Sequence, residues 1–292
     1  MAVTSDAAVV QRRPVLTVVR HAPGPVWILA AGTFVNRAGS FFSTFATLFL
    51  THRGVSVAAL PLTLAGIGAA SMAGSLAGGW LSERAGHRNV LVFSMFASAA
   101  FLLLLANAPS LPLVVTAACL TAFSAQSYIP AASALLIEHS RPEDRVPLFA
   151  FFRLALNLGA ATGPLIAGVV ATRSYTLLFS LDSLTSVLCG LLILIGIQRR
   201  VRPPATAGAD RPHEPDPAAG PRERSGQQPR TSGPARALCV VLFAVAMVYV
   251  QYQSTVPLEL LRHGYSPAFY GVLLTLNGGL VIVAELPVSS VT

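Results

Sequence analysis

The sequence predicts an all-α integral membrane protein, in which a bundle of helices crosses a lipid bilayer. Three observations support this fold class. The chain is 53% hydrophobic and only 11% charged, with a mean hydropathy of +0.64, whereas soluble domains carry about 25% charged residues. Eight apolar segments each approach or exceed the roughly 20 residues that a spanning helix needs. Charged residues gather in the turns between these segments.

The first segment, 26–50, follows a basic tail over residues 1–25 and is longer than the apolar core of a secretory signal, which spans about 7–15 residues. It contains Arg37, although an arginine at the centre of a membrane helix costs about 2.5–3.5 kcal/mol. Nearby polar side chains form a stripe: Asn36, Ser40, Ser43 and Thr47. We expect Arg37 either to line a cavity or to form an ion pair, for which Asp182 is a candidate partner.

The second segment, 57–81, carries small residues at every fourth position: Gly66, Ala70, Gly74 and Gly78. This spacing places them on one face of a helix, which we expect to pack closely against a neighbour. A motion at a domain interface is the functional alternative to simple packing.

A short charged turn follows, from Gly78 to Leu91. We expect Gly78 and Gly79 to allow close helix approach and Gly86 to adopt the positive φ of a tight turn. Charges at the membrane edge come from Glu83, Arg84 and Arg88. Any cytoplasmic turn that follows the positive-inside rule is the plainer alternative.

The third segment, 90–107, and the fourth, 111–137, are mostly apolar, but the fourth carries Gln126 and Tyr128 at membrane depth. These two side chains are candidates for a substrate cavity, and hydrogen bonding between helices is the alternative. The next turn, 138–145, combines a histidine with carboxylates. We expect it to be a solvated, mutually paired turn and not a metal site.

The fifth segment, 146–172, contains the run GAATGPLIAG from Gly159 to Gly168. Gly159 and Gly163 provide a small-residue face for helix packing, and Pro164 removes a backbone hydrogen bond and can bend the helix. Asn157 precedes this run and is a further cavity candidate. The sixth segment, 175–197, contains Asp182. We expect Asp182 to pair with Arg37 rather than to act in proton coupling.

A polar stretch, 198–236, separates these six segments from the last two. It holds eight prolines among Arg, Glu, Gly and Gln, and such a composition buries too little apolar surface to fold. We therefore expect a disordered cytoplasmic linker between a six-helix N-terminal half, 26–197, and the first two helices of a C-terminal half, 237–292.

The seventh and eighth segments, 237–260 and 268–291, carry the remaining polar candidates. Gln251, Tyr252 and Gln253 in the seventh could line a cavity or join helices. Glu285 in the eighth lies near its expected cytoplasmic end, where it either reaches the interface or acts as a proton-coupling acid.

The positions of the arginines predict the orientation in the membrane. The chain contains 20 arginines and no lysine. With the N-terminus inside, fifteen arginines fall on inside segments and three in outside turns, which predicts a multi-pass protein of the cell (inner or plasma) membrane with both ends of this chain cytoplasmic. The net charge of +8 is spread over turns and linker, so a nucleic-acid-binding face is not expected. Three isolated cysteines are typical of small buried hydrophobes: Cys119, Cys189 and Cys239.

The charged turn resembles the cytoplasmic motif G-x-L-x-D-R-x-G-R-R of the major facilitator superfamily. Six positions match it or nearly so: Gly79, Leu81, Glu83, Arg84, Gly86 and Arg88. Glu83 replaces the aspartate and His87 replaces the first arginine of the pair. The resemblance implies a cytoplasmic gate that latches two halves of a transporter together when it faces outward.

The run from Gly159 to Gly168 is similar to the antiporter motif G-x-x-x-G-P-x-x-G-G of the drug-efflux branch, with Ala167 in place of one glycine. The stretches RLALNLG, LFSLDSLTS and YVQYQSTVPL also resemble this branch. The resemblance implies a twelve-helix bundle, of which this chain would hold six N-terminal helices and two C-terminal ones, an apparent truncation after the eighth helix.

The resemblance implies a secondary transporter that exports small molecules or drugs by alternating access, driven by protons and without a cofactor. Its expected partners are a small-molecule substrate, protons and the lipid bilayer. A truncated, transport-incompetent membrane fragment or interaction protein is the alternative. An enzyme is not expected, because the sequence contains no nucleophile–base set, phosphate loop or zinc spacing.

Overall fold

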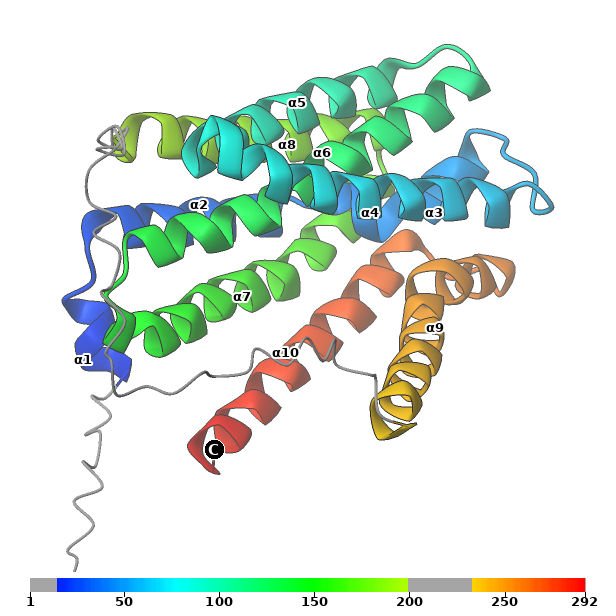
Figure 1. Cartoon of the computed structure of the whole chain (residues 1–292). Coiled ribbons are helices and arrows are strands. Elements are labelled where there is room, and N and C mark those ends of the chain that lie inside the picture. Colours follow the sequence, from blue (N-terminus) through cyan, green and yellow to red (C-terminus); the bar gives the residue numbers. More distant parts are fainter. Residues whose placement is uncertain (1–14, 199–232, 292) are drawn as a thin grey trace, which may run out of the picture.

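The computed structural model describes residues 15–198 and 233–291, and the regular structure within these ranges is helical (Figure 1). Ten α-helices and a short 3₁₀ turn, η1, make up this part of the chain: α1 Val15–Arg20, α2 Gly24–Ala38, α3 Phe41–His52, α4 Leu60–Ala85, α5 His87–Asn107, α6 Leu111–Glu138, η1 Pro142–Asp144, α7 Arg145–Ala171, α8 Tyr175–Gly196, α9 Gly233–Arg262 and α10 Pro267–Val291.

The first predicted span, 26–50, is two helices and not one. α2 ends at Ala38 and α3 begins at Phe41, while Ser40 leaves the helical conformation with φ −77° and ψ 69°. Gly39 packs directly against Thr185 of α8, so closely that a Cβ at this position would overlap the Thr185 side chain. The close approach of α8 therefore requires a glycine where the helix breaks.

Five helices of the described part, α4 to α8, are long and apolar enough to cross a membrane. Their bounds lie within a few residues of the predicted segments. α2 and α3 are 15 and 12 residues long, so they reach spanning length only together. In α10 the described apolar stretch Pro267–Val281 is shorter than a full span.

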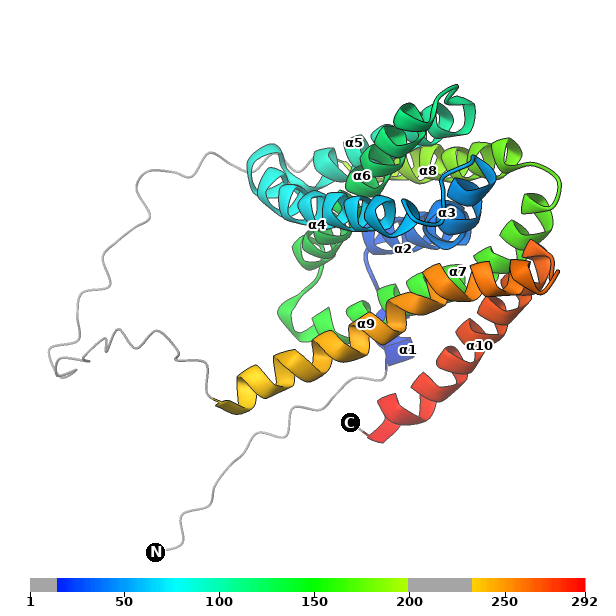
Figure 2. The same cartoon turned by 90° about the vertical axis from the view of Figure 1, so that its right-hand side faces the viewer.

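The helices pack as a bundle in which α7 has a central place. α4 packs on α6, α5 packs on α6 and α8, and α2 packs on α7 and α8. α10 lies along the remaining side of α7. Figures 1 and 2 show α9 and α10 together at the edge of this bundle, and α7 lies between α2 and α10.

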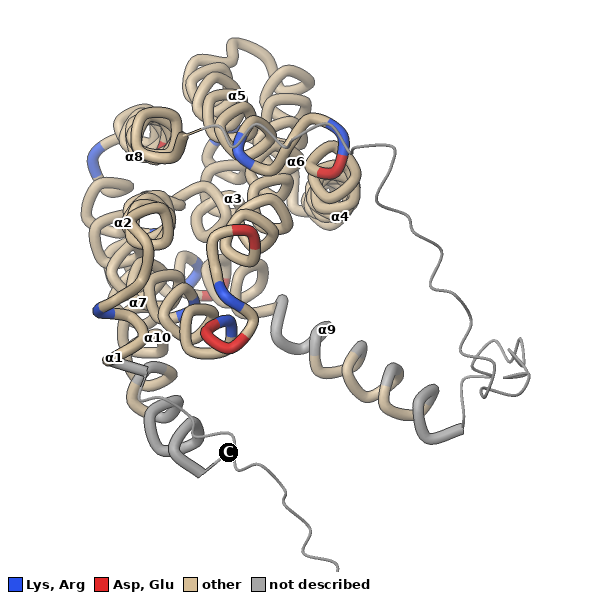
Figure 3. Tube along the Cα trace, turned by 60° about the vertical axis from the view of Figure 1, so that its left-hand side comes forward, with Lys and Arg blue, Asp and Glu red and all other residues tan. Residues whose placement is uncertain are grey.

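Two clusters of buried apolar side chains form the interior of the bundle. One is rich in aromatic residues, with the Phe49 and Phe179 ring centroids 4.7 Å apart. The outer surface is also apolar, and Leu62 and Ile195 are 80% and 79% exposed. Figure 3 shows long stretches of helix without a charged residue. Such surfaces are unusual in soluble monomers and suit contact with lipid.

Parts of the expected domain plan lie outside the described residues. These are residues 1–14 of the tail, with Arg12 and Arg13, and residues 199–232 of the linker. The rest of the expected tail contains α1, which packs against α7. The last four residues of the expected linker, 233–236, belong to the first turn of α9.

Candidate functional site

A buried carboxylate holds the break between α2 and α3. Asp182 of α8 is 4% exposed, and its Oδ2 accepts hydrogen bonds from the backbone N–H groups of Phe41 and Phe42, both at 2.9 Å. These are the first two N–H groups of α3, which have no acceptor within their own helix. A negative charge at this end of a helix also interacts favourably with the positive end of the helix dipole.

The ion pair considered between Arg37 and Asp182 is not present among the described residues. The Asp182 Oδ2 instead accepts the backbone donors of α3, which holds this carboxylate at the start of that helix. Asp182 therefore acts on the break itself and does not neutralise Arg37 by direct contact.

Glycines of α7 bring this helix against the backbone of α2. A Cβ added to Gly159 would lie 2.7 Å from the Cβ of Arg37, and one added to Gly163 would lie 2.8 Å from the carbonyl oxygen of Ala38. Larger side chains at either position would push α2 away. The two glycines thus fix where the backbone of Arg37 lies along α7.

Another face of α7 makes an equally close contact with α10. A Cβ added to Gly168 would lie 2.9 Å from the Cα of Ala268. At Gly271 of α10, a Cβ would overlap the carbonyl oxygen of Pro164. The run from Gly159 to Gly168 therefore serves two helix contacts, where the sequence predicted one small-residue face.

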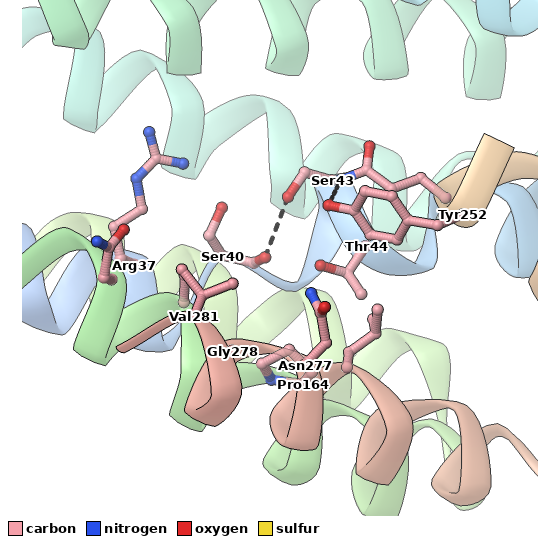
Figure 4. Close-up of a pocket in the computed structure, with 13 residues that line it drawn as sticks. Arg37, Ser40, Ser43, Thr44, Pro164, Tyr252, Asn277, Gly278 and Val281 are labelled. Carbon is pink, nitrogen blue, oxygen red and sulfur yellow. Dashed lines mark hydrogen bonds between the residues drawn. The ribbon is translucent and has the colours of Figure 1, made fainter. Parts of the chain in front are cut away.

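A cavity of about 280 Å³ lies where these contacts meet. Its walls come from α2, α3 and the residue between them, and from α7, α9 and α10: Arg37, Ser40, Ser43, Thr44, Asn157, Ala160, Pro164, Tyr252, Gln253, Leu274, Asn277, Gly278 and Val281. Figure 4 shows Arg37 at one side of the cavity and Tyr252 at the other, with Ser40 and Ser43 between them. Most of these side chains are polar, although the surrounding bundle is apolar.

Hydrogen bonds order the α9 wall of the cavity. The Gln253 Nε2 donates to the Tyr252 hydroxyl oxygen at 2.8 Å (Figure 4). The Thr47 hydroxyl of α3 donates to the backbone carbonyl of Gln253 at 3.0 Å. α3 and α9 are therefore bonded to each other at the level of the cavity.

Arg37 is the one charged side chain among the described residues that line this cavity. Its Nε is buried and has no hydrogen-bond partner there. A guanidinium stays protonated in proteins and needs acceptors for its N–H groups. The site therefore presents a fixed positive charge with unused donor capacity.

The turn between α4 and α5 is a separate structure at the ends of these helices. Gly86 has φ +86° and links the two helices directly. Arg88 reaches the end of α8, where its guanidinium donates to the carbonyl oxygens of Ile197 and Leu194, both at 2.5 Å. Arg88 thus satisfies carbonyl groups that have no donor within α8.

The charged residues Glu83 and Arg84 of this turn face outward, and its two neighbouring glycines differ in their contacts. Glu83 is exposed, and the Arg84 guanidinium carbon lies 3.8 Å from the centroid of the Trp80 ring. Gly78 packs so closely on α6 that a Cβ would overlap its backbone, whereas nothing lies within 4 Å of a Cβ at Gly79. Only Gly78 of this pair provides the predicted close approach.

Two cavity candidates instead join helices inside the six-helix part. Asn36 donates from Nδ2 to the Ser186 hydroxyl oxygen at 3.3 Å. The hydroxyl groups of Tyr128 and Thr33 share a hydrogen bond of 2.5 Å in a buried setting. Asn36 and Tyr128 therefore form hydrogen bonds between helices, which was the alternative to lining the cavity.

Two further candidates, Gln126 and Gln251, do not line the cavity in the described structure, and the side chain of a third, Glu285, is not described there. Gln126 is half-buried on α6, and Gln251 is exposed on α9. Glu285 lies in α10, but its side chain is outside the described residues. No group of three His, Cys, Asp or Glu side chains that could hold a metal ion occurs within 15–198 and 233–291.

The cavity also contains residues that the sequence interpretation missed. Asn277 of α10 and Thr44 of α3 both line it. Asn277 carried a usable signal, because an amide inside an apolar segment is expensive to bury without a partner. Thr44 carried little signal, because single threonines in membrane helices usually bond to their own backbone.

The chain matches the family described as the Major Facilitator Superfamily over residues 27–291. YqjV, an uncharacterized MFS-type transporter of Bacillus subtilis (strain 168), is 24% identical over 279 residues, which cover 90% of this chain and 63% of that protein. YttB, another such transporter of this strain, is 25% identical over 276 residues, 92% of this chain and 66% of YttB. The chain thus spans slightly less than two thirds of the length of each relative.

Two further similarities are informative. A Na⁺, Li⁺, K⁺/H⁺ antiporter of Planococcus maritimus is 32% identical over 157 residues, which cover 52% of this chain and 37% of that protein. The crystal structure of a D-xylose-proton symporter superposes with a TM-score of 0.57 at 13% identity, and covers 95% of this chain and 70% of the symporter. At this identity the superposition establishes the shared fold alone.

Proposed function

The chain belongs to the Major Facilitator Superfamily, a family of multi-pass membrane transporters, and we propose that the polar cavity is the site where it binds a small solute for transport by alternating access. The observation that carries this proposal is the position of the cavity. It lies at the junction between the six-helix part and the α9–α10 pair, with walls from both. A solute bound there would contact both parts of the protein and could bias their relative arrangement.

The contact between α7 and α10 supports the same mechanism. Small residues along this contact let the two backbones approach closely without interlocking side chains. A smooth contact of this kind allows one helix to rock against the other without repacking large side chains. The cavity next to it could then open toward one side of the membrane at a time.

We further propose that transport is export coupled to protons. The relative from P. maritimus is a cation/H⁺ antiporter, and the run from Gly159 to Gly168 is similar to the antiporter motif of the drug-efflux branch.

The coupling test has two stages. Full-length protein is expressed in a bacterial strain that lacks its main efflux pumps, and a susceptibility panel identifies a solute whose toxicity falls. The purified protein is then placed in liposomes, and flux of that solute is measured with and without an imposed pH gradient. We expect the gradient to accelerate flux; equal rates in both conditions would refute proton coupling.

We propose that the protein resides in the cell membrane with both described ends of the bundle on the cytoplasmic side. The support is the arginine bias, fifteen against three. The test introduces single cysteines, Ser56→Cys or Glu143→Cys, into a variant that lacks the native cysteines. A maleimide that cannot cross the membrane then reports which side of the membrane each cysteine faces. Ser56→Cys should react in intact cells and Glu143→Cys only after permeabilisation, and the opposite pattern would invert the topology.

A further inference from the structure

We propose that the cavity takes a small organic anion, and that the Arg37 guanidinium binds its carboxylate or phosphate group. The inference rests on the proposed transport function, because it names the substrate class of the same cavity. Neither the similarity to drug-efflux proteins nor the similarity to a cation/H⁺ antiporter gives a reason to expect an anionic substrate. The argument comes from the charge of the cavity walls and from the unpaired Nε of Arg37.

The first step is the charge of the lining. Arg37 is positively charged, and no carboxylate lines the cavity among the described residues. The remaining polar walls are neutral hydroxyl and amide groups, such as Asn157, Gln253 and Asn277. A cationic solute would meet a like charge on the cavity wall and no carboxylate, whereas an anion would be attracted.

The second step is the unsatisfied donor. The Arg37 Nε is buried without a hydrogen-bond partner in the described structure. Arg37 as a whole is half-buried, but a donor of a charged group that is shielded from water and lacks an acceptor is unfavourable. An oxyanion supplies the missing acceptors, and guanidinium groups bind carboxylate and phosphate through paired, charge-assisted hydrogen bonds.

The third step excludes the nearest internal anion as the partner. Asp182 is buried and its Oδ2 accepts two backbone hydrogen bonds from the start of α3. It does not line the cavity and forms no ion pair with Arg37 in the described structure. Turning Asp182 toward Arg37 would leave the Phe42 N–H group without an acceptor and would leave the Phe41 N–H group with the Gly39 carbonyl alone, so a solute anion is the less costly partner.

The fourth step concerns how firmly Arg37 is held. Gly159 and Gly163 press α7 against the α2 backbone at Arg37 and Ala38. The base of the arginine is therefore fixed between two helices, which lowers the entropy lost when a ligand is bound. The volume of about 280 Å³ is slightly below the range of about 300–1,000 Å³ for drug-sized ligands, and favours a small solute.

The test measures binding by full-length purified protein, as the shift in its thermal unfolding with increasing probe concentration. Two probe series change charge on a nearly constant skeleton: glucuronate, glucose and glucosamine; and benzoate, benzamide and benzylamine. Glucose 6-phosphate separates phosphate from carboxylate recognition. The variants are Arg37→Gln, Arg37→Lys and, as a matched control, Arg173→Gln, which removes an exposed arginine in the turn between α7 and α8.

We expect at least one acid to stabilise the wild type more than its neutral and amine counterparts. Arg37→Gln should weaken that binding about 10- to 100-fold, as loss of a hydrogen bond between charged groups predicts. Arg37→Lys should retain part of the affinity, and Arg173→Gln should retain all of it. Gel filtration and unfolding without probe show whether each variant is folded, and Arg37→Lys keeps the test valid if Arg37→Gln is not.

The proposal is overturned if the neutral or amine probes bind as well as the acids, if acid binding survives Arg37→Gln, or if no acid in the panel binds. Flux in liposomes separates this outcome from failure of the transport function. Transport of a neutral or cationic probe would refute the anion site and leave transport intact. Binding of an acid through Arg37 without any flux would support the anion site and refute the transport function.

Discussion

Replacing Asp182 tests the capped break in the first span most directly. Asp182→Asn keeps the shape and one acceptor oxygen but removes the charge, whereas Asp182→Ala removes the acceptor entirely. The two hydrogen bonds at stake are both 2.9 Å long and connect α8 to Phe41 and Phe42, which are 3% and 7% exposed. Water is therefore poorly placed to replace the carboxylate.

The magnitude follows from the number and type of these bonds. A hydrogen bond to a charged group contributes about 1.5–3 kcal/mol and a neutral one about 0.5–1.5 kcal/mol. Asp182→Asn should then lower the free energy of unfolding by about 2–3 kcal/mol over two bonds. Asp182→Ala leaves the buried Phe42 N–H group without an acceptor, at about 1–3 kcal/mol. It also removes the charged acceptor of the Phe41 N–H group, which keeps its 2.8 Å bond to the Gly39 carbonyl, at about 1.5–3 kcal/mol, so the expected loss is about 2.5–6 kcal/mol.

The assay is thermal unfolding of purified protein in detergent, followed by intrinsic fluorescence and by the fraction that remains monodisperse after heating. The unfolding temperature should fall in the order wild type, Asp182→Asn, Asp182→Ala. Ser183→Ala is the control on the same helix, since its hydroxyl donates one neutral hydrogen bond of 3.0 Å to the Ala99 carbonyl. The capping argument fails if Asp182→Ala unfolds at the wild-type temperature, or if Ser183→Ala lowers it more than Asp182→Ala.

Two further predictions use paired variants. Gly78→Ala should destabilise the protein by about 1–3 kcal/mol because the added Cβ overlaps the α6 backbone. Gly79→Ala places its Cβ in open space and should leave the unfolding temperature unchanged or slightly raised. Equal effects of the two variants would refute the packing assigned to Gly78. Arg88→Ala should lower stability and speed proteolysis at the end of α8, because two charge-assisted hydrogen bonds are lost, whereas Arg84→Ala removes only an exposed contact with an indole ring. Limited proteolysis would compare these two variants.

The sequence predicted the helices of this fold more successfully than its contacts. Apolar length depends on local composition, so α4 to α8 were found within a few residues. The break at Gly39 and Ser40 was missed because the apolar pattern continues on both sides of it. Its cause is a close approach by Thr185 and a bond from Asp182, more than 140 residues later in the chain, and no single-segment pattern reports such a contact.

The cavity was only partly predictable for a related reason. Polar residues at membrane depth were the correct class to examine, but hydrophobic segments give no reliable rotational phase when every face is apolar. Arg37 and Tyr252 line the cavity, whereas Tyr128 bonds to another helix and Gln251 is exposed. The four-residue spacing that includes Gly78 did provide a phase, and it distinguishes Gly78 from its neighbour Gly79.

The break in the first span also determines which parts of the protein can move together. α2 is bonded to α6 and α8 through its own side chains, while α3 is bonded to α9 by Thr47. Backbone helical hydrogen bonds do not run continuously across Ser40, so bending there requires rotation about very few bonds. In the transport cycle proposed above, this break is therefore a place where α2 and α3 can tilt relative to each other, and a tilt that carries α3 away from α8 breaks its two hydrogen bonds to the Asp182 carboxylate.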